Sequence, residues 1–300
     1  MTLRESVSLR ASAMLERSPA EFLFLLSAAG QYAGAVIAIG LFDDLSPATV
    51  AWLRVLSAAV ILLAVGRRAH HTNWSAHDLA WVGIFGASTA LMNLFFYLGI
   101  ESLPLGKGVA IEFIGPVAVA AARTRTARNW WALVLAAGGV VVLGGVELGD
   151  EPVALLFILV ASVMWAGYIV AGSRVALGER GVAGLGLGMA MGSLVIMPFS
   201  LADAGTALTT PSLLGACVLV GLLSSVVGYG IDQSTLRRIP MRRFSVLLAL
   251  LPVCAMVFGL VFLDQTPTLI DLGGMALVLA GVAIQEREEI ERHQPVGTTT

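Results

Sequence analysis

The stretch Leu103–Pro116 reads LPLGKGVAIEFIGP, and a similar stretch, Ile239–Pro252, reads IPMRRFSVLLALLP 136 residues further on. In both, one proline opens an apolar run and a second, Pro116 or Pro252, lies inside it. Glu112 is an acid within the first run, whereas the second run has leucine at the matching position. The chain is therefore predicted to contain two copies of one unit, of which one has a carboxylate in an apolar setting.

The composition indicates a membrane protein. Of the 300 residues, 57% are apolar and 13% are charged, and the mean hydropathy is +0.87. Soluble domains have roughly 45–50% apolar and about 25% charged residues, so lipid is the expected solvent here. Cys217 and Cys254 both lie in apolar runs, where they are expected to pack rather than to form a disulfide or a metal site.

Ten apolar runs are long enough to cross a bilayer, which takes roughly 20 residues of helix. A polar N-terminal tail, 1–19, and a C-terminal tail, 286–300, flank them. Helix-capping residues mark three starts, at Ser18-Pro19, at Ser46-Pro47 and at Ser75 with Asp78. The predicted spans are 20–41, 47–65, 79–99, 104–122, 130–148, 152–172, 183–202, 212–234, 240–263 and 267–285.

The basic residues mark one side of the predicted membrane. Sixteen of the eighteen lie in the two tails, in the loops that follow spans two, four, six and eight, or within the first four residues of span nine. The loops on the other side are acidic, and only Arg54 and Lys107 break the pattern. Because cytoplasmic loops are enriched in lysine and arginine, we expect a multi-pass protein with both tails in the cytoplasm.

The spans divide into two halves, 20–148 and 152–285. Residues 22–40 resemble residues 155–173, which supports the repeat seen in the opening stretch. Five spans are an odd number, so the second half must enter the membrane from the opposite face. The predicted fold is therefore an all-α membrane protein with ten transmembrane helices in two inverted five-helix repeats. Inverted repeats are a recurring plan of secondary transporters.

This plan resembles the drug/metabolite transporter superfamily and its EamA domains. The segments GVAIEFIGPVAVA (108–120) and YGIDQSTLRRIPMRRFSVLLALLP (229–252) look like the threonine/homoserine exporter-type branch. The resemblance covers about residues 20–285 and implies two EamA repeats in an inner-membrane exporter of small solutes, often amino acids, driven by the proton gradient. In that branch an acid commonly precedes the second proline, where this chain has Leu251.

Two opposite charges, Arg54 and Glu112, lie inside spans two and four at the same predicted depth. Both should be about 10–12 Å below the outer interface, at about 1.5 Å per residue. Charged residues in spans usually face the bundle interior. One interpretation is a structural ion pair between the two spans. The other is functional: Arg54 binds a substrate carboxylate, and Glu112 binds an ammonium group or carries a proton.

Asp232, near the inner end of span eight, is the third acid of interest. It is expected to pair with Arg237 or Arg238 at the interface, and the sharper hypothesis is a proton-coupling acid in a cavity on the cytoplasmic side. Pro116 and Pro252 each remove a backbone hydrogen bond inside a span. They are candidate hinges for alternating access, or fixed kinks that shape packing.

Polar and aromatic residues inside the spans are candidates for lining a substrate cavity. Each one alone is more typical of packing or of the interfacial aromatic belt, but their spread over five spans favours a cavity for a small zwitterion. They are Gln31, Tyr32, Asn93, Tyr97, Trp165, Tyr168 and Tyr229.

Small residues at intervals of four predict close helix contacts. Span seven has the ridge Gly184, Gly188 and Gly192. Spans eight and ten have the pairs Gly221 with Ser225 and Ala276 with Ala280.

Several functions lack the sequence signals they would need. There is no GxxxxGK[ST], HExxH or GxSxG motif, and no cofactor or metal site is predicted. The histidines at 70, 71 and 77 are expected to lie in a solvated loop. Membrane topology already explains the arginine loops, so nucleic acid is not an expected partner, whereas anionic lipid is.

The primary hypothesis is a secondary transporter that exports a small amino acid or related metabolite by proton antiport, with alternating access. An exporter of bulky cationic or aromatic compounds is the alternative, for which Leu251 and the many aromatic residues leave room. A membrane-embedded enzyme is a remote third, because the acids are isolated. The expected partners are a small-molecule substrate and membrane lipids, and a homodimer stays open.

Overall fold

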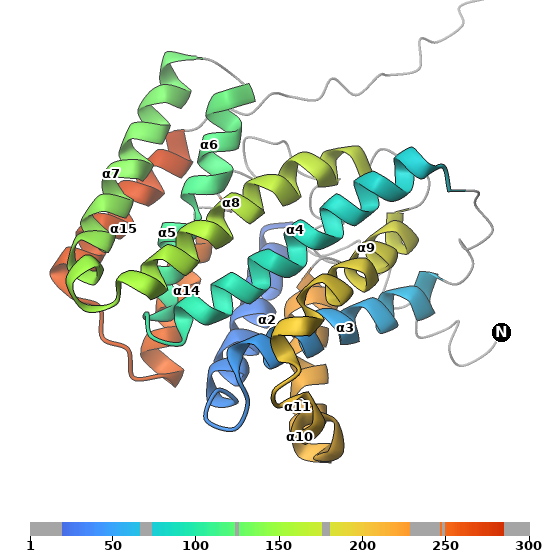
Figure 1. Cartoon of the computed structure of the whole chain (residues 1–300). Coiled ribbons are helices and arrows are strands. Elements are labelled where there is room, and N and C mark those ends of the chain that lie inside the picture. Colours follow the sequence, from blue (N-terminus) through green and yellow to red (C-terminus); the bar gives the residue numbers. More distant parts are fainter. Residues whose placement is uncertain are drawn as a thin grey trace, which may run out of the picture.

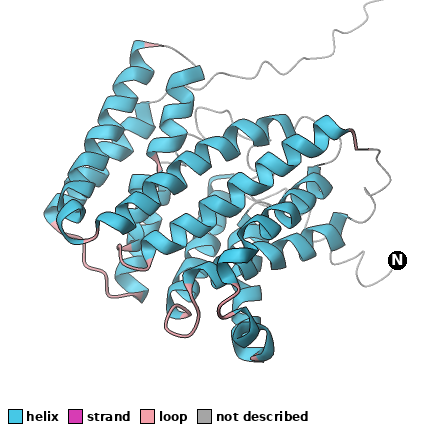
Figure 2. Cartoon of the chain, viewed as in Figure 1, coloured by secondary structure: helices cyan, strands magenta, loops and turns pink. Residues whose placement is uncertain are grey.

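The protein is described by a computed structural model that covers residues 20–66, 74–123, 126–175, 181–228, 247 and 250–284. All regular structure in these residues is helical, which confirms the predicted all-α class (Figure 2). Seven helical segments are long and apolar enough to cross a membrane. They coincide with the first seven predicted spans: α2 (Ala20–Gly40), α3 (Pro47–Val65), α4 (Ala76–Ile100), α5 with α6 (Leu105–Glu112 and Ile114–Arg123), α7 (Ala127–Asp150), α8 (Pro152–Val175) and α9 (Gly181–Ile196).

Three shorter apolar segments lie where the last three spans are predicted. They are α11 (Pro211–Gly221), which continues into the π-helical segment η3 (Leu222–Val227), α14 (Leu250–Phe262) and α15 (Leu269–Ile284). The short helices η2 (Met197–Ser200) and α10 (Ala204–Thr209) connect α9 to α11. Parts of these last spans fall outside the described residues, so the count of ten and the inverted repeat stay predictions.

Two of the predicted helix starts are confirmed. The side chain of Ser46 accepts a hydrogen bond from the backbone N–H of Thr49, and Pro47 occupies the first turn of α3. Ser75 and Asp78 form a reciprocal capping box at the start of α4. Ser18 and Pro19 lie outside the described residues. Where they are described, these local signals set the chain positions at which the long helices begin.

Helices of the two predicted halves interleave. α4 packs along α8 and α9, α7 along α15, α5 against α14, and α3 against α9 and α11 (Figure 1). The buried core takes residues from all of these helices. Polar side chains buried at these contacts therefore bridge segments that are far apart in the sequence.

Glycine allows the closest of these contacts, between α4 and α9. A Cβ atom at Gly86 would lie 1.8 Å from the carbonyl oxygen of Gly188, and one at Gly192 would lie 2.2 Å from that of Gly86. The predicted ridge on α9 is thus confirmed at these two positions. On α15 the close approach to α7 is made by Gly274 and Gly281; of the predicted pair Ala276 and Ala280, Ala276 is exposed within the chain.

Loops 41–46, 101–104, 201–203 and 263–268 lie along one edge of the molecule, the lower edge in Figure 1. At this edge Asp203 caps the start of α3. Its carboxylate accepts hydrogen bonds from the backbone N–H of Ser46, from the hydroxyl of Ser46 (3.0 Å) and from the hydroxyl of Thr49. One acid from the second predicted half therefore fixes a helix of the first.

Replacing Asp203 with asparagine should lower the unfolding temperature at pH 7 by roughly 2–4 °C. Burial alone would raise the pKa of Asp203, but the hydrogen bonds from Thr49 and Ser46 outweigh it and hold the pKa below its ordinary value. A carboxylate with a lowered folded-state pKa stabilises the fold above about pH 4 and loses this contribution as the pH falls further. Thermal unfolding of the detergent-solubilised protein between pH 7 and pH 3 measures the effect.

The difference between wild type and Asp203→Asn should shrink below about pH 4. Asp264→Asn is the matched control, because Asp264 lies on the same edge with a left-handed backbone, φ 54°, that asparagine also tolerates. If wild type and Asp203→Asn differ in unfolding temperature by the same amount at pH 3 and pH 7, the charge of Asp203 contributes nothing to stability.

Candidate functional site

The fourth predicted span is broken in its middle, at Phe113. α5 ends at Glu112, and α6 begins at Ile114. Pro116 explains the break, because it has no N–H to donate to the carbonyl oxygen of Glu112, four residues before it. The break leaves Glu112 at the end of a half-helix, an arrangement that is typical of binding sites in transporters.

Pro252, the other candidate hinge, has a different place in the structure. It is the third residue of α14, in the helix's first described turn, and it is buried. Of the ten residues before α14 begins, only Leu247 is described. A kink at Pro252 that matches the break at Pro116 therefore stays a prediction.

The carboxyl group of Glu112 is buried without full hydrogen bonding. The residue is 7% exposed, and within the described part of the chain its Oε1 atom has no hydrogen-bond partner. Burying a polar atom unpaired costs roughly 1–3 kcal/mol, and more for a charged group. The fold thus holds an acid that a proton or a cationic ligand would stabilise.

Arg54 lies near this acid and is held by two other helices. Its Nη1 atom donates to the hydroxyl of Tyr97 on α4 (2.9 Å), and its Nε atom donates to the hydroxyl of Ser225 on η3 (3.3 Å). The guanidinium carbon also lies 5.3 Å from the centre of the Tyr97 ring, within range of a cation–π contact. Since Tyr97 is fully buried, the position of Arg54 is well defined.

The interpretation of Arg54 and Glu112 as a direct ion pair is wrong. No nitrogen of Arg54 lies within 4.0 Å of a carboxylate oxygen of Glu112 in the described structure. The two side chains are within electrostatic range of each other but form no direct contact. The hydrogen bonds to Tyr97 and Ser225 orient the guanidinium group of Arg54.

Ser225 reaches Arg54 because α11 runs close to α3. A Cβ atom at Gly221 would lie 2.7 Å from the carbonyl oxygen of Arg54, so only glycine permits this approach. One turn later the wider π-helical turn of η3 presents two adjacent serines to different neighbours. Ser224 donates to the carbonyl oxygen of Gln31 on α2 (3.2 Å), and Ser225 binds Arg54.

Aromatic rings lie around Arg54 and Glu112. Phe113, next to Glu112 in the chain, packs edge-on against Trp165 of α8 with the ring centres 4.9 Å apart. Tyr97 packs edge-on against Phe42, with 5.7 Å between the ring centres. The structure therefore brings together Arg54 and Tyr97, and it places Glu112 and Trp165 beside Phe113.

The other predicted cavity residues are engaged nearby or elsewhere. Gln31 donates to Ser27 on its own helix (3.2 Å), and Asn93 donates to the carbonyl oxygen of Thr89 one turn earlier (2.8 Å). Two tyrosines pack on rings of other helices: Tyr32 on Phe258, with ring centres 6.3 Å apart, and Tyr168 on Phe85, at 5.1 Å. Tyr229 and Asp232 lie outside the described residues.

Two features of the polar interior escaped sequence reasoning. Ser225 was interpreted only as a small packing residue, and the signal was the adjacent pair of serines in the middle of an apolar span. Lys107 was noted only as an exception to the charge pattern, yet it pairs with Asp271. Asp271 could have been found from the sequence TLID at 268–271, in which an acid three positions after a threonine is typical of a helix capping box.

Comparison with known proteins places the fold and the sequence. The model of the EamA-like transporter family matches residues 152–285. The threonine/homoserine exporter RhtA of Escherichia coli (strain K12) is 31% identical over 263 residues, which cover 86% of this chain and 88% of that protein. The protein of the same name from Salmonella typhimurium (strain LT2) is 30% identical over the same shares of both chains.

More distant proteins extend the similarity. A transporter of Archaeoglobus fulgidus, described only as uncharacterized, is 26% identical over 255 residues, which cover 81% of this chain and 90% of that protein. A protein of known crystal structure with 19% sequence identity superposes with a TM-score of 0.56, covering 88% of this chain and 95% of that chain, and this likeness concerns the fold alone. With a relative 31% identical along most of its length, the chain belongs to the EamA-like transporter family, in the branch of the threonine/homoserine exporter RhtA.

Proposed function

We propose that the protein exports small amino acids across the inner membrane, with threonine and homoserine as the first candidates, in exchange for protons. The names of its relatives support this class of substrate. One observation carries the proposal: the buried Glu112 has an oxygen without a hydrogen-bond partner among the described residues, and the nearby Arg54 donates to Tyr97 and Ser225.

This pair of charges matches the two ends of a zwitterion. The guanidinium group of Arg54 has five N–H groups, and its described hydrogen bonds use only the Nη1 and Nε atoms. A substrate carboxylate would bind the remaining N–H groups, since arginine suits carboxylates geometrically. The ammonium group would bind Glu112 and supply the partner that its Oε1 atom lacks.

Proton exchange follows from the same carboxyl group. In this proposal Glu112 binds either the ammonium group of the substrate or a proton. Each amino acid that moves outward is therefore exchanged for a proton that moves inward. Access would alternate by movement of 20–148 against 152–285, with Pro116 and Pro252 as hinges and both tails in the cytoplasm. The family match to 152–285 supports the second unit, and Asp232 would pass protons on the cytoplasmic side.

A transport assay in proteoliposomes tests the proposal. Vesicles loaded with unlabelled threonine should take up labelled threonine by counterflow, and an inside-acid pH gradient should drive accumulation without internal threonine. Empty vesicles and vesicles with a collapsed gradient are the controls. Absence of uptake for threonine, homoserine and the other small neutral amino acids would exclude the proposed substrate class.

The same vesicles test export of bulky cationic or aromatic compounds. The rings of Phe113 and Trp165 beside a buried acid favour such a substrate, whereas the positive charge of Arg54 opposes it. Efflux of a cationic dye that threonine does not inhibit would support this alternative. Inhibition by threonine together with threonine counterflow would support amino-acid export.

A further inference from the structure

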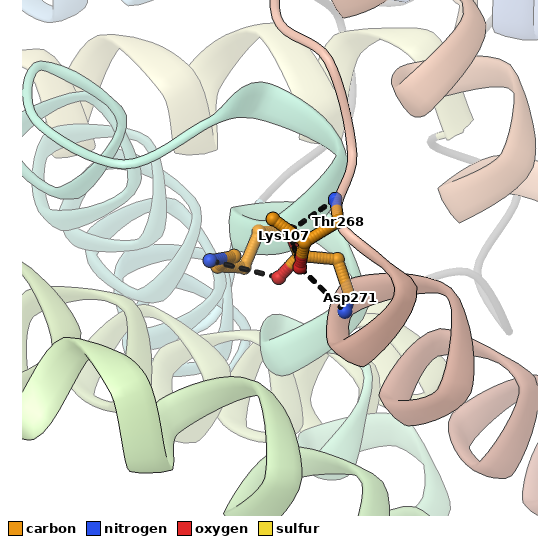
Figure 3. A network of polar contacts seen from close by, with 3 residues as sticks. All are labelled: Lys107, Thr268 and Asp271. Carbon is orange, nitrogen blue, oxygen red and sulfur yellow. Dashed lines mark hydrogen bonds and ion pairs between the residues drawn. The ribbon is translucent and has the colours of Figure 1, made fainter.

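A second set of buried charges, Lys107 and Asp271, joins α5 to α15 (Figure 3). The Nζ atom of Lys107 lies 2.9 Å from Oδ1 of Asp271, and the two side chains are only 8% and 11% exposed. Lys107 is the only lysine of the chain. It lies on the fourth predicted span, whereas Asp271 lies on the tenth, so the pair connects the two predicted halves.

The start of α15 holds Asp271 in one orientation. Its Oδ2 atom accepts hydrogen bonds from the backbone N–H (2.9 Å) and the hydroxyl (2.8 Å) of Thr268, and its own N–H donates to that hydroxyl (3.2 Å). This reciprocal cap, visible in Figure 3, occupies Oδ2 and leaves Oδ1 directed at Lys107. A carboxylate fixed in this way is preorganised to bind a positive charge through Oδ1.

A cavity of about 150 Å³ adjoins the pair. Gln265 forms one wall, where its Oε1 atom accepts a hydrogen bond from the backbone N–H of Leu105 (2.9 Å). The turn that brings Gln265 there passes through Asp264, whose backbone is left-handed. Met256 and Met275 supply apolar walls. The volume is below the roughly 300–1,000 Å³ of sites for drug-sized ligands, so the cavity suits a small solute.

We propose that this cavity is a second binding site, which accepts the zwitterionic head group of an amino acid between Lys107 and Asp271. The substrate carboxylate would bind Lys107 Nζ, and its ammonium group would bind Asp271 Oδ1. The Lys107–Asp271 contact would widen, and two ion pairs would replace one.

Charge balance selects the zwitterion. Separating a buried ion pair removes a close opposite charge from each partner, which is costly unless a new charge replaces it. A lone cation would compensate only Asp271 and would face the charge of Lys107, and a lone anion would meet the reverse problem. A zwitterion offers a carboxylate to Lys107 and an ammonium group to Asp271 at the same time, so it replaces both charges that separate when the contact widens.

The position gives this site a place on the proposed export route. Lys107 precedes Glu112 by five residues on α5, about 7.5 Å along the helix towards the edge that holds loops 101–104 and 263–268. That edge is the predicted outer face, so the cavity would be the last site before release. The role in export rests on the proposed function, whereas binding itself does not require transport.

Binding at the second site is tested by measuring the unfolding temperature of a variant that lacks the charges of Arg54 and Glu112. The variant Arg54→Gln with Glu112→Gln removes the charges of the first site, and L-threonine, titrated to 100 mM, should still raise its unfolding temperature. Threonine methyl ester, a cation, and N-acetylthreonine, an anion, should not. Adding Lys107→Gln and Asp271→Asn should weaken the apparent affinity for threonine at least about tenfold.

A charge-swapped variant, Lys107→Asp with Asp271→Lys, separates folding from binding. The swapped variant keeps both charges in the cavity, so threonine should still stabilise it in part. The uncharged variant, Lys107→Gln with Asp271→Asn, should lose most of this stabilisation. Asp43→Asn, at an exposed acid of loop 41–46 on the same edge, should bind as the background does. The proposal is overturned if threonine gives no shift in the background variant, if the methyl ester shifts it equally, or if the uncharged variant binds threonine unchanged.

Discussion

Replacing Glu112 with glutamine should reduce proton-driven threonine uptake by at least about 100-fold while the protein remains folded. Glutamine keeps the size of the side chain but neither exchanges a proton nor pairs with an ammonium group. Glu112 is buried, and its Oε1 atom makes no hydrogen bond in the described structure. Removing the acid should therefore leave the unfolding temperature equal or higher, because a buried group with an unpaired oxygen becomes neutral.

Counterflow in the same vesicles separates the two roles proposed for Glu112. If Glu112 only carries the proton, Glu112→Gln retains threonine counterflow and loses the response to the pH gradient. If it also binds the ammonium group, both activities fall together, which is the expected result. Glu101→Gln is the matched control, because Glu101 is an exposed acid at the end of α4. Full gradient-driven uptake by Glu112→Gln would remove Glu112 from the mechanism.

Local sequence signals predicted the helices well. Apolar length alone placed the first seven spans, and the caps at Ser46 and Ser75 fixed two starts. The glycines of α9 predicted a close helix contact, because repeated small residues at intervals of four have one main physical use in lipid, a close backbone approach; that the partner is α4 came from the structure. Ala276 fits the same pattern but is exposed, since alanine is also common on faces that touch no other helix of the chain.

For the candidate site, the sequence predicted only how deep in the membrane its charged residues lie. Counting residues from the start of each span placed Arg54 and Glu112 at one level, and in the structure they lie within electrostatic range of each other. Whether they touch depends on how α3, α5, α4 and η3 are rotated, which no single helix determines. Tyr97 and Ser225 compete for Arg54 from two other helices, and this competition is a property of the packed bundle alone.

The pair Lys107–Asp271 shows a second limit. Charges at the ends of spans are ordinary at a membrane interface, so neither residue is unusual when its own helix is considered. The pair becomes informative only when α15 places Asp271 against α5 and both side chains are buried. Burial of polar groups near helix ends is therefore the part of this architecture that sequence pattern reasoning misses most readily.

Replacing Arg54 with glutamine should raise the half-saturation concentration for threonine about 30- to 100-fold, because a substrate carboxylate loses a charged partner. Arg54→Lys should recover only part of this affinity. Lysine keeps the charge, but it lacks the planar arrangement of N–H groups that can bind a carboxylate and Tyr97 together. Counterflow measured over a range of threonine concentrations gives these values, and Arg174→Gln, an exposed arginine that stacks on Trp81 at 4.6 Å, is the matched control.

Tyr97→Phe tests whether the tyrosine acts through Arg54. Loss of the 2.9 Å hydrogen bond should release the guanidinium group and weaken threonine binding roughly 3- to 10-fold in the wild-type background. In the Arg54→Gln background the same change should have almost no effect, since the partner that it orients is gone. Equal losses in both backgrounds would instead assign Tyr97 a role of its own, in packing or in direct contact with the substrate.

The carboxylate itself supplies the sharpest test of Arg54. Wild type should prefer threonine to threonine amide, which keeps the ammonium group and the shape but carries no negative charge. Arg54→Gln should reduce this preference at least about tenfold, because it removes the group that distinguishes the two ligands. A general defect in folding or in conformational change would weaken both ligands equally and leave their ratio unchanged. An unchanged ratio would therefore separate Arg54 from carboxylate recognition even if transport by the variant were poor.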